Sequence, residues 1–223
     1  MKDLTTGKPI KIILLFAIPL FIGQLFQLFY SLADTRIVGA ILGETSLAAV
    51  GATTTLSDFL IGLLNGFTNG CAIIIATYFG SGDRDNMKKA IGGTILSGIV
   101  LSVLISAGCL LFLPRILGAL NVADFLMAES KAYIGIVLAG LLAATLYNVC
   151  AAILRALGDS FTPLLFLILA AVLNVVLDYT LIKYGNMGVA GAALATVIAQ
   201  AVSAVLCFFY MKVRYPELSL RRE

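Results

Sequence analysis

An amide and an acid stand inside an apolar run that is long enough to cross a membrane. Asn174 and Asp178 lie four residues apart in the run from Phe161 to Ile182, so on a helix they share one face. A carboxylate in hydrocarbon is costly unless it has a partner, a proton or a cation. The pair therefore predicts either a site that takes up a proton or a small cation, or a buried polar contact within the protein.

A second polar stripe lies in the apolar run nearest the N-terminus. Gln27, Tyr30 and Asp34 are spaced three and four residues apart, which sets them on one face of a helix. Such a face is expected to turn toward protein or a water-filled cavity, because lipid offers no hydrogen bonds. Pro19 precedes the stripe, where it removes a backbone hydrogen bond and bends the helix. A fixed kink and a hinge are both consistent with this position.

The composition is that of a membrane protein. Of 223 residues, 61% are hydrophobic and only 12% are charged, against about 25% charged in soluble globular proteins. The chain has no His, which removes His-based acid–base catalysis and His-ligated metals. No motif of paired carboxylates on neighbouring turns supports an enzyme, and no basic run suits nucleic acid. The four cysteines lack metal-ligand spacing and are interpreted as small packing residues.

Six apolar segments are long enough to span a membrane. They predict an all-α polytopic membrane protein, in which residues 1–223 form a single six-helix transmembrane lobe. Polar turns separate the second helix from the third and the fourth from the fifth. The predicted helices cover residues 10–37, 52–79, 90–113, 130–154, 161–182 and 189–211.

The positive charges give the expected orientation. Six helices put both termini on one side, and eleven Lys and Arg residues fall on that side against four on the other. By the positive-inside rule the first side is cytoplasmic, so we expect a multi-pass protein of the inner cell membrane, surrounded by lipid, with both termini in the cytoplasm. The cytoplasmic set is Lys2, Lys8, Lys11, Arg84, Lys88, Lys89, Arg155, Lys212, Arg214, Arg221 and Arg222, and the outer set is Arg36, Arg115, Lys131 and Lys183.

This orientation allows depth to be counted at about 1.5 Å per residue. Asp34, Asn174, Asp178 and Thr196 then share a level in the outer half of the bundle. Two carboxylates close together in a low dielectric cannot both stay charged and unpaired. One must take a proton, or both must ligate a cation, and four hard oxygen donors suit an alkali cation or a proton better than a soft metal.

Less specific interpretations of these acids remain open. Asp34 is near enough to the membrane interface to pair with Arg36, and Asp178 is open to pairing with other polar groups and backbone. Asp58 is a third acid in apolar surroundings. No matching partner for it is identifiable, and a structural or interfacial role is favoured.

Taken together, these segments resemble the multidrug and toxic compound extrusion (MATE) transporters over essentially the whole chain. Each piece is modest alone, but their order and spacing are specific. The pieces are Pro19 with Asp34-Thr35, Leu47-Ala48-Ala49-Val50-Gly51, the turns Tyr78-Phe79-Gly80-Ser81-Gly82-Asp83 and Leu154-Arg155-Ala156-Leu157-Gly158-Asp159, the pair Asn174 and Asp178, and Gly188-Val189-Ala190-Gly191-Ala192-Ala193 with Thr196.

The resemblance implies a secondary antiporter that exports drugs or other organic compounds, chiefly cations, against Na⁺ or H⁺, with no other cofactor. It implies that the bend near Pro19 is linked to alternating access. It implies a cation or proton site at positions matching Asp34, Asn174, Asp178 and Thr196. It further implies that Gln27, Tyr30 and Asn148 are candidates for the substrate cavity.

The resemblance also implies a second half. Members of this family have about twelve helices in two lobes that are related as parallel repeats. We therefore expect this chain to be the N-terminal lobe of a full transporter, with a C-terminal lobe as its partner, or else a half-size protein that works as a homodimer. A lone lobe would lack the cavity between lobes.

The main alternative is a flippase for lipids or polysaccharide precursors, because related transporters share the general lobe design. A flippase for anionic lipid-linked substrates is expected to line its cavity with Arg or Lys. None of the fifteen basic residues lies clearly in the middle of a predicted helix, which favours organic cations or neutral drugs. A purely structural protein would leave the cost of Asp178 unexplained. Neither the substrate nor the choice between Na⁺ and H⁺ follows from the sequence.

Overall fold

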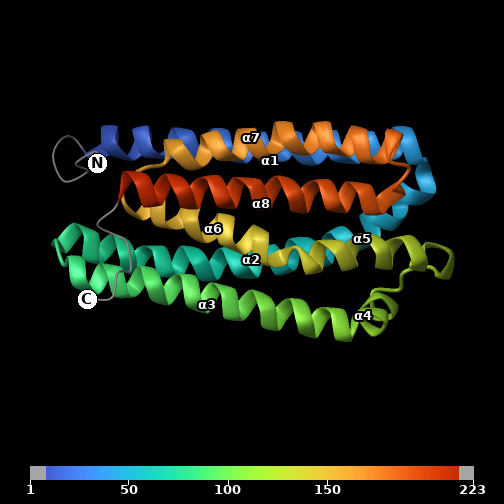
Figure 1. The fold of residues 1–223 in the computed structure, drawn as a ribbon, viewed down its shortest axis with the longest axis horizontal. Helices are drawn as coiled ribbons and strands as arrows, with labels where there is room; N and C mark the ends of the chain where they lie inside the picture. The colour runs from blue at the N-terminus through green and yellow to red at the C-terminus, as the bar shows by residue number, and fades with distance from the viewer. Residues whose placement is uncertain (1–8, 216–223) are drawn as a thin grey trace.

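The chain forms a bundle of long helices (Figure 1) in a computed structural model that describes residues 9–215. The ends of the expected 1–223 lobe, with Lys2, Lys8, Arg221 and Arg222 of the cytoplasmic set, lie outside the described residues. The elements are α1 (Pro9–Leu42), α2 (Glu44–Ser81), α3 (Arg84–Leu111), α4 (Leu113–Ala119), the 3₁₀ turn η1 (Asp124–Leu126), α5 (Met127–Ala139), α6 (Leu141–Ala156), α7 (Phe161–Tyr179), the π turn η2 (Thr180–Tyr184) and α8 (Gly188–Arg214).

The expectation of an all-α membrane protein is confirmed. Within residues 9–215, five helices are long and apolar enough to cross a membrane, and a bent pair of helices makes a sixth span if it is counted as one. The bent pair runs from Asp124 to Ala139 and from Leu141 to Ala156. The beginning of α1 and the end of α8 lie at the same end of the bundle (Figure 1).

The continuous helix predicted over 130–154 is wrong, because the helix breaks at Gly140 with a bend of 43°. Gly140 has ψ near −1°, far from the value of about −42° in a regular helix. A Cβ at this position would lie 2.2 Å from Val197 Cγ2 on α8. The backbone of residue 140 is therefore pressed against α8, an approach that only glycine allows.

The predicted boundaries of the other helices are too short at several ends. α1 continues to Leu42, α2 begins at Glu44 and α3 at Arg84, where polar residues extend the helix past its apolar part. Conversely, α7 ends at Tyr179 and its last predicted turn is a π turn. Capping and turn geometry set these ends, and hydropathy does not report them.

Two turns at one end of the bundle repeat the same local chemistry. Gly82 and Gly158 have positive φ angles of 75° and 86°, which glycine adopts without steric cost. An aspartate follows each glycine and caps the next helix. Asp83 Oδ1 accepts a hydrogen bond of 3.1 Å from Asn86 N, and Asp159 Oδ1 accepts one of 3.0 Å from Thr162 N. These caps satisfy N–H groups that would otherwise lack partners at the start of α3 and α7.

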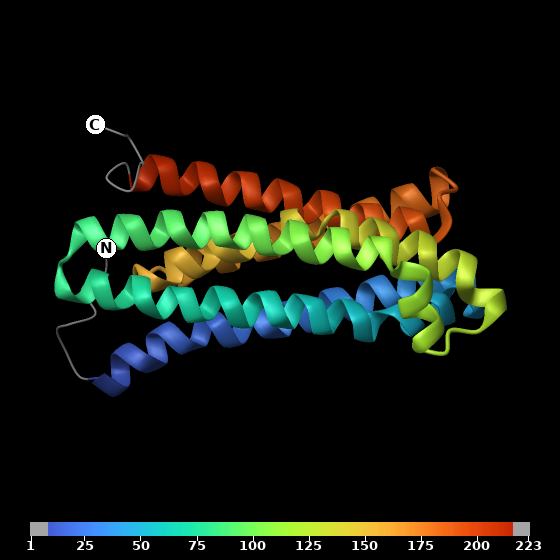
Figure 2. The ribbon, with the colours of Figure 1, turned by 90° about the horizontal axis from the view of Figure 1, so that it is seen from below.

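The packing leaves room near the middle of the bundle. α8 packs on α5, α6 and α7, α1 lies along α7, and α2 packs on α3, α5 and α6. One apolar cluster, which includes Met87, Ile153 and Met211, fills the end with the two capped turns. Others, built around Leu117 and Val38, fill the opposite end. Figure 2 shows α1 diverging from α2 toward its beginning, whereas α2 and α3 run side by side.

Candidate functional site

A cavity of about 270 Å³ lies between the apolar clusters. Six helices contribute to its wall, and the contributed side chains are mainly hydroxyls, amides, aromatic rings and carboxyls. The polar and aromatic lining residues are Gln27, Tyr30, Ser31, Asp34 and Thr35 from α1, Thr54, Ser57 and Asp58 from α2, Tyr133 from α5, Tyr147 and Asn148 from α6, Asn174 from α7, and Thr196, Gln200 and Ser203 from α8.

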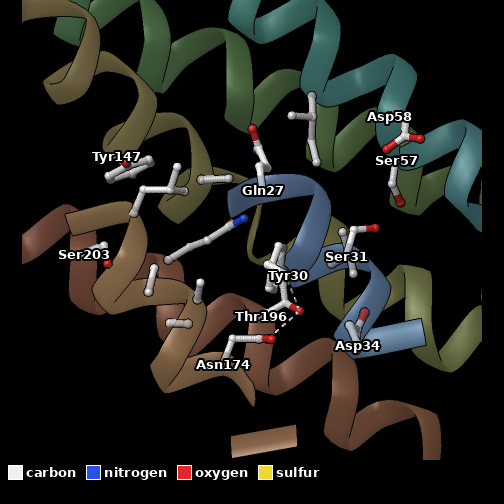
Figure 3. A pocket seen from close by; sticks show the side chains of 18 of the residues that line it. Gln27, Tyr30, Ser31, Asp34, Ser57, Asp58, Tyr147, Asn174, Thr196 and Ser203 are labelled. Atoms are coloured by element: carbon white, nitrogen blue, oxygen red, sulfur yellow. Dashed lines mark hydrogen bonds between the residues drawn. The ribbon is translucent and has the colours of Figure 1, made fainter. Parts of the chain in front are cut away.

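Thr196 is the point at which three helices meet in this cavity. Its Oγ1 accepts hydrogen bonds from Tyr30 OH at 3.4 Å and from Asn174 Nδ2 at 3.2 Å. It donates its own proton to the carbonyl of Ala192 at 3.2 Å. The dashed lines in Figure 3 show Tyr30 and Asn174 converging on this hydroxyl. The hydroxyl of Thr196 thus joins α1, α7 and α8 by hydrogen bonds.

Beside this junction lies a group of buried oxygens without hydrogen-bond partners. Both carboxylate oxygens of Asp178, Oδ1 of Asp34 and Oδ1 of Asn174 are in this state. The side chains of Asp178 and Asn174 are 0% and 1% exposed. The carboxyl groups of Asp34 and Asp178 lie close enough to interact with each other. Two ionised carboxylates cannot donate to one another, so the pair requires a shared proton or a cation.

The positions of these groups follow from which faces of α7 and α8 pack against neighbouring helices. Asn174 and Asp178 share the buried face of α7, whereas Val172 and Val176 on other faces are 59% and 54% exposed. On α8, buried small residues surround Thr196 and allow close approach of α1 and α7. These are Ala192, Ala193, Ala195 and Ala199.

The structure brings most of the predicted residues together. Of the four predicted ion-site residues, Asp34, Asn174 and Thr196 line the cavity, and Asp178 lies one helical turn beyond Asn174 and behind the wall. The predicted cavity residues, Gln27, Tyr30 and Asn148, all line it. Pro19 is not part of the lining. It sits within α1, which continues as one helix from Pro9 to Leu42.

Sequence reasoning missed several members of the cavity wall. Tyr133 and Tyr147 are not among the residues predicted to line the cavity, and no partner for Asp58 is predicted. The signal was present in α2, where Thr54, Ser57, Asp58 and Ile61 recur at spacings of three and four and all line the cavity.

The side-chain oxygens of the site are acceptors, and those without partners are open to a donor or a cation. The unpartnered oxygens of Asp34, Asn174 and Asp178 suit a proton or a hard cation such as Na⁺. Thr196 Oγ1 already accepts two hydrogen bonds, so in this state it is the least available of the four predicted ligands. Within the described part of the chain, no Lys or Arg lines the cavity.

Comparison with known proteins agrees with this picture. The family model MatE matches residues 19–180. The "Probable multidrug resistance protein YpnP" of Bacillus subtilis (strain 168) is 30% identical over 209 residues, which cover 94% of this chain and 47% of that protein.

Two solved structures are similar over nearly the whole chain. One is the "Outward-facing conformation of a multidrug resistance MATE family transporter of the MOP superfamily", at 29% identity and a TM-score of 0.88, covering 96% of this chain and 48% of that one. The other is a MOP superfamily transporter from Pyrococcus furiosus, at 28% identity and a TM-score of 0.87, covering 97% and 49%, whose "reverse polarity of binding pocket suggests different function".

The chain spans about half the length of the curated relatives and solved structures that it matches. The family match covers most of the chain, and the proteins in it are transporters, not enzymes. The helical bundle, its membrane-length spans and its buried acids agree with that assignment. The chain therefore belongs to the MATE family of multidrug efflux transporters.

Proposed function

We propose that this chain is one lobe of a secondary antiporter that exports drug-like compounds, chiefly organic cations, against a gradient of Na⁺ or H⁺. The observation that carries the proposal is the set of unpartnered buried oxygens on Asp34, Asn174 and Asp178. This set lies beside a cavity whose described lining holds polar and aromatic groups but no Lys or Arg. An exchangeable proton or cation satisfies those oxygens, and the cavity holds the exported compound.

In the proposed mechanism the ion acts on the position of α1. Asp34 and Tyr30 belong to α1, whereas Asp178 and Thr196 belong to α7 and α8. A proton or cation shared by Asp34 and Asp178 stabilises the arrangement in which α1 lies against α7. Its release removes that stabilisation and favours a different position of α1, with Pro19 as the hinge. The ion shifts the equilibrium only by its difference in affinity for the two arrangements.

We propose that the half-length chain forms the complete transporter together with a partner lobe of the same fold. That partner is a C-terminal lobe or a second copy of this chain, and the substrate passes between the two. We propose that both termini are cytoplasmic in the inner membrane. The distribution of eleven Lys and Arg residues against four supports this orientation. The flippase alternative has less support, because its anionic substrates require basic groups that the described cavity lining lacks.

The test measures whether efflux by the variant Asp178→Asn still depends on the ion gradient. The protein is expressed from its native gene in a strain without other efflux pumps, and ethidium efflux from membrane vesicles is driven by Na⁺ or by a pH gradient. We expect the variant to lose the dependence of efflux on the ion gradient. Asp124→Asn, which changes an exposed acid in η1, is the matched control and should behave as the unaltered protein. Gradient-driven efflux that is unchanged in Asp178→Asn would contradict the proposal.

A further inference from the structure

Asp58 is an acid at membrane depth whose side chain is exposed. It lies fourteen residues from the start of α2 at Glu44, or about 21 Å along the helix axis. No described residue forms a hydrogen bond or an ion pair with it. Ionisable groups in membrane spans are costly and usually mark a substrate or ion pathway. The position of Asp58 therefore requires an explanation that packing does not supply.

The cavity wall gives Asp58 that context. On α2 it lines the cavity together with Thr54, Ser57 and Ile61. Figure 3 shows Ser57 and Asp58 on the opposite side of α1 from Asn174. Tyr133 from α5 lines the same cavity. Two acids, exposed Asp58 and half-buried Asp34, thus line one cavity, and Asp178 lies buried behind its wall.

An unpartnered buried group that belongs to the proposed ion site also lines this cavity and marks it as a place where a ligand binds. Asn174 lines it, is 1% exposed, and leaves its Oδ1 without a partner. A buried amide oxygen in this state requires a donor or a cation. The surroundings of Asp178 and of Asp58 differ in the size of the ligand that can reach them. Asp178 is 0% exposed and can be reached only by a proton or a small ion, whereas exposed Asp58 can meet a bulky group.

We propose that Asp58 is the substrate-recognition acid of the cavity, which pairs with the positive nitrogen or phosphorus of an organic cation, while Asp34 and Asp178 hold the coupling ion. This inference rests on the proposed antiport function and assigns the two kinds of cation to separate acids. The rings of Tyr30, Tyr133 and Tyr147 line the same cavity. Tyrosine rings attract organic cations through their faces, and the described lining contains no Lys or Arg to oppose them.

If the exported cation and the coupling ion bind to separate acids, the way in which each opposes the binding of the other changes. The two cations do not compete for one carboxylate. They repel each other across a single cavity of about 270 Å³, where the low dielectric strengthens that repulsion. Loss of Asp58 should therefore weaken recognition of organic cations and leave ion binding intact.

The experiment compares a cationic probe with a neutral probe of similar shape. The protein, expressed from its native gene, is purified in detergent, and binding of radiolabelled tetraphenylphosphonium is measured together with its displacement by neutral triphenylphosphine oxide. We expect Asp58→Asn to lower the tetraphenylphosphonium affinity at least tenfold and to change that of triphenylphosphine oxide less than twofold. Asp58→Glu, which keeps the charge, should stay within threefold of the unaltered protein. Asp124→Asn, which changes an exposed acid in η1, is the control.

The outcomes separate this inference from the function on which it rests. Equal losses for both probes, or an unchanged affinity for the cation in Asp58→Asn, overturn the role of Asp58. Failure of the unaltered protein to bind tetraphenylphosphonium also overturns it. Asp178→Asn should retain binding of the probe but lose its displacement by Na⁺ or by acid. Displacement that persists in Asp178→Asn contradicts the proposed antiport function, whatever Asp58 does.

Discussion

Tyr30 on α1 donates a hydrogen bond of 3.4 Å to Thr196 Oγ1 on α8. The same oxygen accepts a second bond from Asn174 Nδ2 and donates to Ala192 O. A hydroxyl has one proton and two lone pairs, so every hydrogen-bonding position of Thr196 is filled. A cation that takes Thr196 as a ligand must therefore displace Tyr30 or Asn174. The longer bond belongs to Tyr30, which makes α1 the helix that is released.

The variant Tyr30→Phe frees one lone pair of Thr196. A neutral hydrogen bond contributes about 1 kcal/mol, so we expect the half-saturating Na⁺ concentration to fall roughly fivefold. If protons couple transport, the pH midpoint of uptake shifts instead. Binding of ²²Na⁺ and the pH dependence of efflux measure these quantities. The control is Tyr147→Phe, which removes a phenol bonded to Pro163 O at 3.0 Å and leaves Thr196 unaltered. Equal effects of the two substitutions would refute the displacement argument.

Pro19 is expected to act on motion and not on binding. It lies inside α1, where proline removes one helical hydrogen bond. Pro19→Ala restores that bond and stiffens the helix, so efflux should slow severalfold while ion affinity stays unchanged. Pro163→Ala is the control, because Pro163 lies in the first turn of α7, where the missing N–H has no helical partner. A Pro19→Ala protein with an unchanged efflux rate would show that the bend is only structural.

Gly140 should tolerate no larger residue. A Cβ there would lie 2.2 Å from Val197 Cγ2 and 2.9 Å from Val197 Cβ, so α5 and α8 must separate. Overpacking of this kind costs about 1–3 kcal/mol, and Gly140→Ala should lower the melting temperature in detergent. Adding Val197→Ala should restore most of the loss. Gly135→Ala, whose Cβ would meet Leu113 Cδ2 at 4.0 Å, should be nearly neutral, and a similar loss there would argue against the clash.

Asp83 should give the turn between α2 and α3 a dependence on acidity. Hydrogen bonds from the side chain and backbone of Asn86 hold the pKa of Asp83 below its ordinary value of 3.8. The ionised form is therefore favoured by folding, so its stabilisation is present above that value and is lost as the pH falls through the lower pKa of the folded state. The melting temperatures of the unaltered protein and of Asp83→Asn should differ at neutral pH and converge as the pH falls below the lowered pKa of Asp83 in the folded state. Asp85→Asn, which changes the acid two residues further along the chain, serves as the control. A difference in melting temperature that grows in acid would contradict the role of Asp83 as a helix cap.

The sequence could predict what depends on spacing within one helix. The shared face of Asn174 and Asp178 and the stripe of Gln27, Tyr30 and Asp34 follow from helical periodicity. The structure places the stripe and Asn174 in the cavity wall and Asp178 behind it. Contacts between distant helices could not be predicted in the same way. The break at Gly140 depends on Val197, 57 positions further along the chain, and Asp58 meets its surroundings only after α2 packs against α5 and α6. A single sequence gives no such pairings.

The acids in and beside this cavity come from three different helices, Asp34 from α1, Asp58 from α2 and, behind the wall, Asp178 from α7. Their attraction for a positive ligand is long-ranged and has little directional preference, unlike a hydrogen bond. A cavity of this kind discriminates by the sign of charge and accepts many shapes. Acceptance of many different cations would then follow from the positions of the three carboxylates. A transporter that accepts few compounds would require directional hydrogen-bond donors in their place.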